Sequence, residues 1–216
     1  MLSAAMPVIT ITGLTGAGRE PIGAIVAERL DAELVDRKLY DEVSRRLDLP
    51  SDEVERQEEC PSSLLDRVLQ ALGTASVEFA APPEATAWNP PYGEVAFDTR
   101  KAVLQVTQEV IREAARSGNA VIVGRGGPYV LNDVPGIMHV FVHGDQAERA
   151  RMVQRVHGLD EAEAMSRVKS TDANRTAYVK QVYNHDWLRA THYHLVLNSC
   201  HFGWERTADM VVRAAT

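Results

Sequence analysis

The chain has 216 residues, of which 45% are hydrophobic and 25% are charged, and these values indicate a globular protein with one full-sized core. The formal net charge of −7 argues against a nucleic-acid-binding surface, and no apolar run reaches the roughly 20 residues of a membrane helix. The 2 cysteines cannot form a disulfide framework, and no signal-peptide pattern is present. We therefore expect a soluble cytoplasmic protein without nucleic-acid or membrane partners; the sequence specifies no oligomeric state.

The first strong pattern along the chain is a strand, a glycine loop and a helix. Residues 8–12 form a β-branched apolar run, and Gly13, Gly16 and Gly18 follow it directly. From Pro21 to Leu30 apolar residues recur at helical spacing, and proline is tolerated in the first helical turn. This arrangement predicts a site where backbone N–H groups and a helix N-terminus hold a phosphate. The alternative is a turn whose glycines only let strand and helix pack closely.

The rest of the chain continues to alternate strands and helices. Short apolar runs predict further strands at 33–36, 120–123, 137–142 and 194–198. Helical spacing predicts helices at 99–117, at 146–183 with a break near Gly158, and at 204–213. Helical patterns over 38–78 lead into a proline-rich segment, 79–95, that is typical of a loop. Apolar strands separated by helices predict an α/β fold with a mainly parallel five-stranded sheet covered on both faces.

The glycine loop has the spacing of the P-loop signature, Gly-x-x-x-x-Gly-Lys-Ser/Thr. Gly13 and Gly18 match it, but Arg19 and Glu20 stand at the lysine and hydroxyl positions. Arginine still supplies positive charge, although its planar group is bulkier and docks differently. The hydroxyl normally contacts Mg²⁺, so Glu20 is a candidate metal ligand. In the absence of a metal, its carboxylate would repel a phosphate.

Several segments together resemble the cytidylate kinase-like family. They follow the family's order over most of the chain and comprise residues 11–20, 34–40, 121–126 and 172–178, with further similarity at 187–198. Members of this family often carry Gly-Arg-Glu where true cytidylate kinases carry lysine and a hydroxyl residue. The resemblance implies a three-layer P-loop NTPase-type fold in one domain, residues 1–216. It also implies a helical monophosphate-binding insert at about 38–95 and a lid at about 146–180.

The resemblance further implies which residues form the site. ATP with Mg²⁺ would lie on the loop residues Gly13, Gly16, Ala17, Gly18, Arg19 and Glu20. The acceptor nucleotide would contact Asp36, Arg100, Arg125 and Asp172, with Lys101 as an alternative to Arg100. Catalytic positive charge would come from Arg19, Arg155 and Arg175. The lid would also carry Arg149, Arg167 and Lys169; solvated surface arginines, or a helical Asp172–Arg175 salt bridge, are the structural alternatives.

These implications lead us to expect a phosphotransferase that moves the γ-phosphoryl group of ATP to a nucleoside monophosphate, with CMP or dCMP as the nearest acceptor. Two alternatives stay open. One is a nucleotide-sensing protein that has lost transfer activity, with Arg19 and Glu20 as the mark of that loss. The other is a kinase for another small phosphate acceptor.

Four histidines gather near the C-terminus, at positions 185, 192, 194 and 201. On an extended segment His192 and His194 would project from the same face, as two metal ligands do. No cysteine or carboxylate spacing accompanies them, so we expect packed or exposed histidines here.

Overall fold

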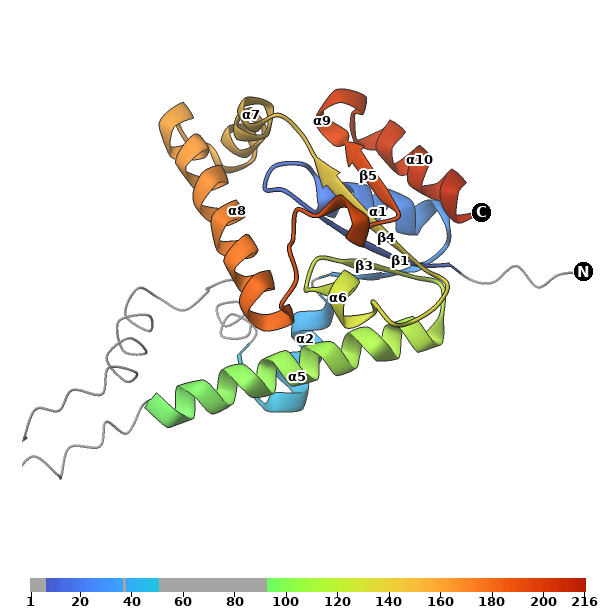
Figure 1. The fold of residues 1–216 in the computed structure, drawn as a ribbon, viewed down its shortest axis with the longest axis vertical. Coiled ribbons are helices and arrows are strands. Elements are labelled where there is room, and N and C mark those ends of the chain that lie inside the picture. Colours follow the sequence, from blue (N-terminus) through green and yellow to red (C-terminus); the bar gives the residue numbers. More distant parts are fainter. Residues whose placement is uncertain (1–6, 37, 51–92) are drawn as a thin grey trace, which may run out of the picture.

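A computed structural model describes residues 7–36, 38–50 and 93–216 (Figure 1). The side chains of residues 38, 93–98 and 100 are outside this description. The helical patterns predicted over 51–78 and the proline-rich stretch 79–92 also lie outside the described residues.

The described residues form one parallel sheet of 5 strands in the order β2-β3-β1-β4-β5. The strands are β1 (Val8–Gly13), β2 (Glu33–Val35), β3 (Ala120–Val123), β4 (Ile137–His143) and β5 (Leu195–Asn198). In the register, Thr10 of the central strand lies between Ile122 and His139. Strands β1 and β3 are buried at every position, as expected where helices cover both faces of a sheet. The predicted α/β fold is confirmed, and each strand lies within one residue of its predicted bounds.

Helices cover both faces of the sheet (Figure 1). Side chains alternate between the two faces along a strand, so Ile9 and Ile11 point to one side and Val8 to the other. On the first side pack α1 (Arg19–Arg29) and α10 (Trp204–Ala215). On the second pack α2 (Lys38–Leu47), α5 (Gly93–Ser117) and α6 (Gly127–Val130). Two separate hydrophobic cores therefore hold the central strands in place.

Two helices, α7 (Gln146–His157) and α8 (Glu161–Tyr183), form a hairpin on the side toward which β4 points (Figure 1). The predicted break at Gly158 is observed, with φ 66° at this residue. Asp160 then begins α8 through a capping box with Glu163. No helix in the described part of the chain combines the length and apolarity needed to cross a membrane.

Three short helices were not predicted: α6, η1 (Ala190–His192) and α9 (Ser199–Phe202). Each has four residues or fewer, which is too short for a helical repeat of apolar residues to show. The predicted loop at 79–95 was wrong in its last residues, because α5 begins at Gly93 instead of Thr99. Proline disrupts helix interiors, and the last proline of this stretch is Pro91. The helix can therefore begin soon after it.

Candidate functional site

A cavity of about 640 Å³ lies where the strands end. Its walls come from the loop after β1, from Asp36 after β2, from the segment Gly124–Gly126 after β3, and from α7 and α8. In a parallel sheet the carboxyl ends of the strands share one edge, where ligands commonly bind. The cavity brings the ends of these three strands together.

The glycine loop is packed tightly against the rest of the protein. Gly16 and Gly18 have φ values of 82° and 80°, in the left-handed region that glycine adopts readily. A Cβ at Gly16 would lie 2.5 Å from the carbonyl oxygen of Arg149, and a Cβ at Gly18 would clash with the indole of Trp204. The alternative interpretation of this loop was that its glycines only allow close packing, and such close packing is observed. It leaves the cavity side of the loop open, since Gly16 and Gly18 both line the cavity.

Helix α1 presents its N-terminus to this cavity. Gly18 is the N-cap and offers no side chain to cap the first-turn amides, and Pro21 in that turn has no N–H. Gly18, Arg19, Glu20 and Pro21 all line the cavity. Uncapped amides and the helix dipole together favour an anion at such a position.

Arg19 and Glu20 form an ion pair at the start of α1, with Nε 2.7 Å from Oε1. The side chain of Arg19 is 15% exposed and that of Glu20 is 51% exposed. Burial by itself would raise the pKa of Glu20, but the charges of Arg19 and Arg175, together with its own backbone amide, lower that pKa below its usual value. Glu20 is therefore ionised at neutral pH. It can contact a cation, and it opposes a bare phosphate.

The described lining of the cavity is rich in positive charge. It contains four arginines and two carboxylates, namely Arg19, Arg125, Arg167, Arg175, Glu20 and Asp36. A net positive wall in a protein of charge −7 is a local feature that attracts anions.

Arg125 occupies a constrained backbone position after β3. Its φ is 54°, and the glycines on either side also have positive φ values, 73° and 71°. Its guanidinium lies 4.0 Å from the centroid of the Tyr40 ring, a cation–π contact that ties it to α2. Strained residues of this kind cluster at ligand sites.

Other predicted site residues stand outside the cavity wall. Within the loop, Gly13 packs against the backbone of Val142, and Ala17 is fully buried. Arg155 is exposed on α7, where Nη2 lies 3.7 Å from Met152 Sδ, and it is not part of the lining. The Arg100 side chain is outside the described residues.

Asp172 is also absent from the cavity lining. Its Oδ1 accepts a hydrogen bond from the Thr15 amide at 2.8 Å, and its Oδ2 pairs with Arg149 Nη1 at 2.8 Å. Asp172 therefore pairs with Arg149, and both side chains face the glycine loop instead of the cavity.

A sequence profile of the cytidylate kinase-like family matches residues 8–201. The chain belongs to the cytidylate kinase-like family. The match includes the glycine loop, the strand ends that meet at the cavity, and the α7–α8 hairpin.

Two solved structures share the fold of this family member. An uncharacterized protein from Eubacterium ventriosum superposes with a TM-score of 0.66 at 18% identity, covering 97% of this chain and 98% of that one. Shikimate kinase from Bacteroides thetaiotaomicron superposes with a TM-score of 0.51 at 15% identity, also over 97% and 98%. At these identities the likeness establishes the three-layer α/β fold.

Among curated proteins, uronate isomerase from Corynebacterium glutamicum is 29% identical over 112 residues. The match covers 52% of this chain and 21% of that protein. The cytidylate kinase-like chain thus spans about a fifth of the length of this relative.

One wall of the cavity is aromatic and was not predicted from the sequence. Four aromatic side chains contribute to it, namely Tyr129, Tyr178, Trp187 and Trp204. Burial raises the pKa of Tyr129 to about 12, although the hydrogen bond to Tyr193 lowers it, so its hydroxyl stays protonated. These residues belong to α6, α8, the segment after α8, and α10. Tyr178 and Trp187 lie in segments that carry the family resemblance, but no local pattern shows that the four side chains form one wall, because the fold alone brings them together.

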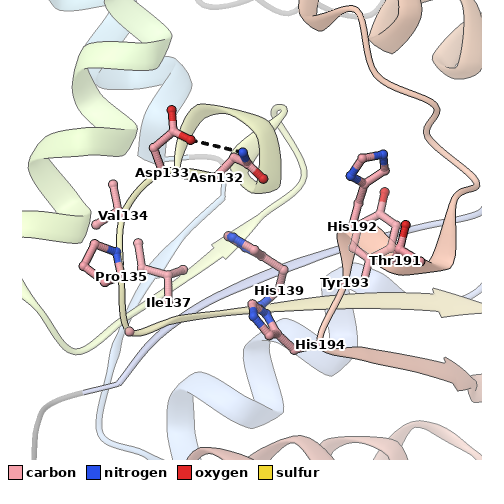
Figure 2. A pocket seen from close by; sticks show the side chains of 11 residues that line it. Asn132, Asp133, Val134, Pro135, Ile137, His139, Thr191, His192, Tyr193 and His194 are labelled. Atoms are coloured by element: carbon pink, nitrogen blue, oxygen red, sulfur yellow. Dashed lines mark hydrogen bonds between the residues drawn. The ribbon is translucent and has the colours of Figure 1, made fainter.

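Two of the four C-terminal histidines, His192 and His194, line a second hollow of about 370 Å³ near the start of β4, together with His139 (Figure 2). His139 is buried, with Nδ1 2.8 Å from Thr10 Oγ1, and its amide donates to His194 Nδ1 at 2.9 Å. The ring of His192 makes an edge-to-face contact with the ring of His185. In the parts of the chain that the structure covers, no group of three or more His, Cys, Asp or Glu residues is placed to hold a metal ion.

His139 predicts a pH dependence of stability in this family member. Burial, with a smaller contribution from His194, lowers the pKa of His139 to about 4. Histidine in an unfolded chain titrates near pH 6.5, so as the pH falls the unfolded state takes up the proton first. The contribution of neutral His139 is therefore complete above about pH 6.5 and is lost toward about pH 4.

The test is urea denaturation of wild-type protein and of His139→Asn, whose side chain can still bond to Thr10. Between about pH 7.5 and 5.5 we expect the wild type to lose about 1 kcal/mol more unfolding free energy than the variant. Equal losses in both proteins would show that His139 does not titrate in this way.

Proposed function

We propose that the protein is an ATP-dependent kinase that phosphorylates a nucleoside monophosphate, with CMP and dCMP as the first acceptors to test. The observation that carries this proposal is the cavity at the glycine loop, where four arginines and an uncapped helix N-terminus face one space. Such a kinase must hold two anionic nucleotides side by side, and an acidic protein needs a locally positive wall to do so. The family membership supports the same chemistry. We place this activity in the cytoplasm, in one domain that spans residues 1–216.

ATP would lie on the loop from Gly13 to Glu20 and would supply the transferred phosphoryl group. Arg19 would contact its phosphates, and the backbone amides at the start of α1 would donate hydrogen bonds to the phosphate oxygens. Mg²⁺ is commonly bound through one or two carboxylates together with substrate phosphates. Glu20 fits that role, because it is half-exposed, ionised and on the cavity wall.

The acceptor would lie among Asp36, Arg125 and Arg100, beneath the insert at about 38–95. Asp36 and Arg125 line the same cavity as the glycine loop, so both nucleotides would share one space. The aromatic wall offers flat surfaces to a base. Phosphoryl transfer depends mainly on alignment and charge stabilisation, which these side chains would supply.

Positive charge at the transferred group would come from Arg19 and Arg175. Arg175 lines the cavity and donates to Thr15 Oγ1 at 3.1 Å, so it already reaches the glycine loop from α8. Arg155 lies outside the lining. We propose that it joins the site when the outer part of the lid, about 146–180, closes over the nucleotides.

A second candidate function is nucleotide sensing without transfer. The 2.7 Å ion pair between Arg19 and Glu20 favours it, because the carboxylate offsets part of the charge that would stabilise the transferred phosphoryl group.

Two measurements test these proposals in sequence. In a thermal-shift assay ATP with Mg²⁺ should raise the unfolding temperature, because a ligand that binds the folded state stabilises it. A coupled assay of ADP release with CMP, dCMP and UMP then separates the kinase from the sensor. Stabilisation without ADP release for any acceptor would favour the sensor. No stabilisation by any nucleotide would overturn both functions.

A further inference from the structure

Thr15, in the glycine loop, is held by the α7–α8 hairpin through all its polar groups. Its amide donates to Asp172 Oδ1 at 2.8 Å, and its carbonyl accepts from Arg149 Nη1 at 2.8 Å. Its hydroxyl accepts from Arg175 Nη1 at 3.1 Å. Two helices far along the chain therefore determine how this peptide unit is oriented.

Arg149 and Asp172 form an ion pair beneath the loop that is largely shielded from solvent. Arg149 is 5% exposed, and its Nε also donates to the carbonyl of Gly144 at 3.0 Å. The Asp172 side chain is 17% exposed, and each of its carboxylate oxygens has a partner. Because the two charges compensate each other, neither is left over to bind a ligand. Removing one would leave the other buried and uncompensated.

The backbone of Arg149 touches the next loop residue as well. A Cβ on Gly16 would lie 2.5 Å from the Arg149 carbonyl oxygen, so the first turns of α7 are seated directly on the loop. Side chain and backbone of one residue thus fix two successive loop residues. The loop cannot change shape at Thr15 and Gly16 without moving this end of the hairpin.

We propose that Arg149, acting with Asp172, is a positioning residue that sets the conformation of the glycine loop and thereby the strength of nucleotide binding. The binding part of this inference rests on the proposed function. The Thr15 amide already donates its hydrogen bond to Asp172. A bound phosphate would therefore accept hydrogen bonds from the amides that follow in the chain, at the start of α1. Loss of Arg149 frees the Thr15 carbonyl and leaves Asp172 without its cation.

The experiment compares Arg149→Met with Arg151→Met, an exposed arginine on the same helix. Hydrogen exchange of peptides covering residues 13–20 reports on the loop without any nucleotide. Titration with ADP and Mg²⁺ reports on binding. For Arg149→Met we expect loop exchange to be about tenfold faster and the Kd for ADP to rise by about tenfold. In the activity assay of Arg149→Met the KM for ATP should rise by a larger factor than kcat falls. Arg149→Lys should bring the loop exchange rate and the Kd for ADP part of the way back to the wild-type values. Arg151→Met should match the wild type.

A double variant, Arg149→Met with Asp172→Asn, keeps the test decisive if the single variant folds poorly. It removes the uncompensated buried charge, and asparagine can still accept from the Thr15 amide, but the Thr15 carbonyl remains unheld. We expect near-normal unfolding with faster loop exchange. Unchanged exchange over residues 13–20 in both variants would overturn the inference, as would an unchanged Kd in a protein that binds ADP. Wild-type protein that does not bind ADP would instead refute the proposed function, and the exchange data would still decide the role of Arg149.

Discussion

Gly16→Ala is expected to lower the free energy of unfolding by about 2–5 kcal/mol and to abolish nucleotide binding. About 1–2 kcal/mol comes from forcing an L-residue into the left-handed conformation, where Gly16 has φ 82°. A further 1–3 kcal/mol or so comes from the new methyl group, which would lie 2.5 Å from the Arg149 carbonyl oxygen. That oxygen belongs to a backbone that cannot rotate away, so the loop or the start of α7 must shift. Urea denaturation and titration with ADP and Mg²⁺ measure the two effects.

Gly136→Ala is the matched control for this change. Gly136 has φ 81°, nearly the same strain for alanine, but no atom lies within 4 Å of the position of its Cβ. We expect this variant to lose about 1–2 kcal/mol and to bind nucleotide normally. The difference between the two variants isolates the close approach of α7 to the loop. Equal losses of stability in the two variants would mean that the loop and α7 move apart at little cost. The positive φ would then be the only reason for glycine at position 16.

Arg19→Ala should reduce ATP-dependent transfer by about 10²–10³-fold, the size seen when one charge-stabilising donor is removed from an active site. The Kd for ATP should rise by at least about tenfold, whether the protein is a kinase or a sensor. The stability of the fold should change little, because the ion-pair partner Glu20 is half-exposed and can be solvated. ADP release and ATP titration measure the first two effects, and urea denaturation measures the third.

Two further variants make the Arg19 result specific. Arg19→Lys restores the residue of the P-loop signature and should keep most of the activity. Arg29→Ala removes an arginine from the other end of α1, where it pairs with Glu205 and Asp209 on α10, and should leave activity unchanged. Unchanged ATP affinity in Arg19→Ala would count against the assignment of the glycine loop to nucleotide binding.

Local patterns in the sequence were sufficient to predict the elements around the glycine loop. The β-branched run of β1, the glycines after it and the apolar spacing of α1 are each read within a dozen residues. The meeting of Asp36 and Arg125 at one cavity could also be predicted, since parallel strands place their carboxyl ends together. The family resemblance was confirmed by the match over residues 8–201.

The partners of charged side chains were decided by the tertiary structure. By sequence, Arg149 and Arg155 are both arginines of a charged helix, and a solvated surface was an open interpretation for each. In the fold Arg149 is buried beneath Thr15, 134 residues away, while Arg155 is exposed. The aromatic wall likewise combines residues from separate elements.

The sequence of this protein therefore determined its strands, its longer helices and the family to which it belongs, because each of these depends on residues that are neighbours along the chain. The tertiary structure decided which arginine supports the loop and which faces the cavity. The physical reason is that burial and charge pairing depend on contacts between helices that are distant in the chain, and the helical repeat alone does not specify which neighbour each face meets.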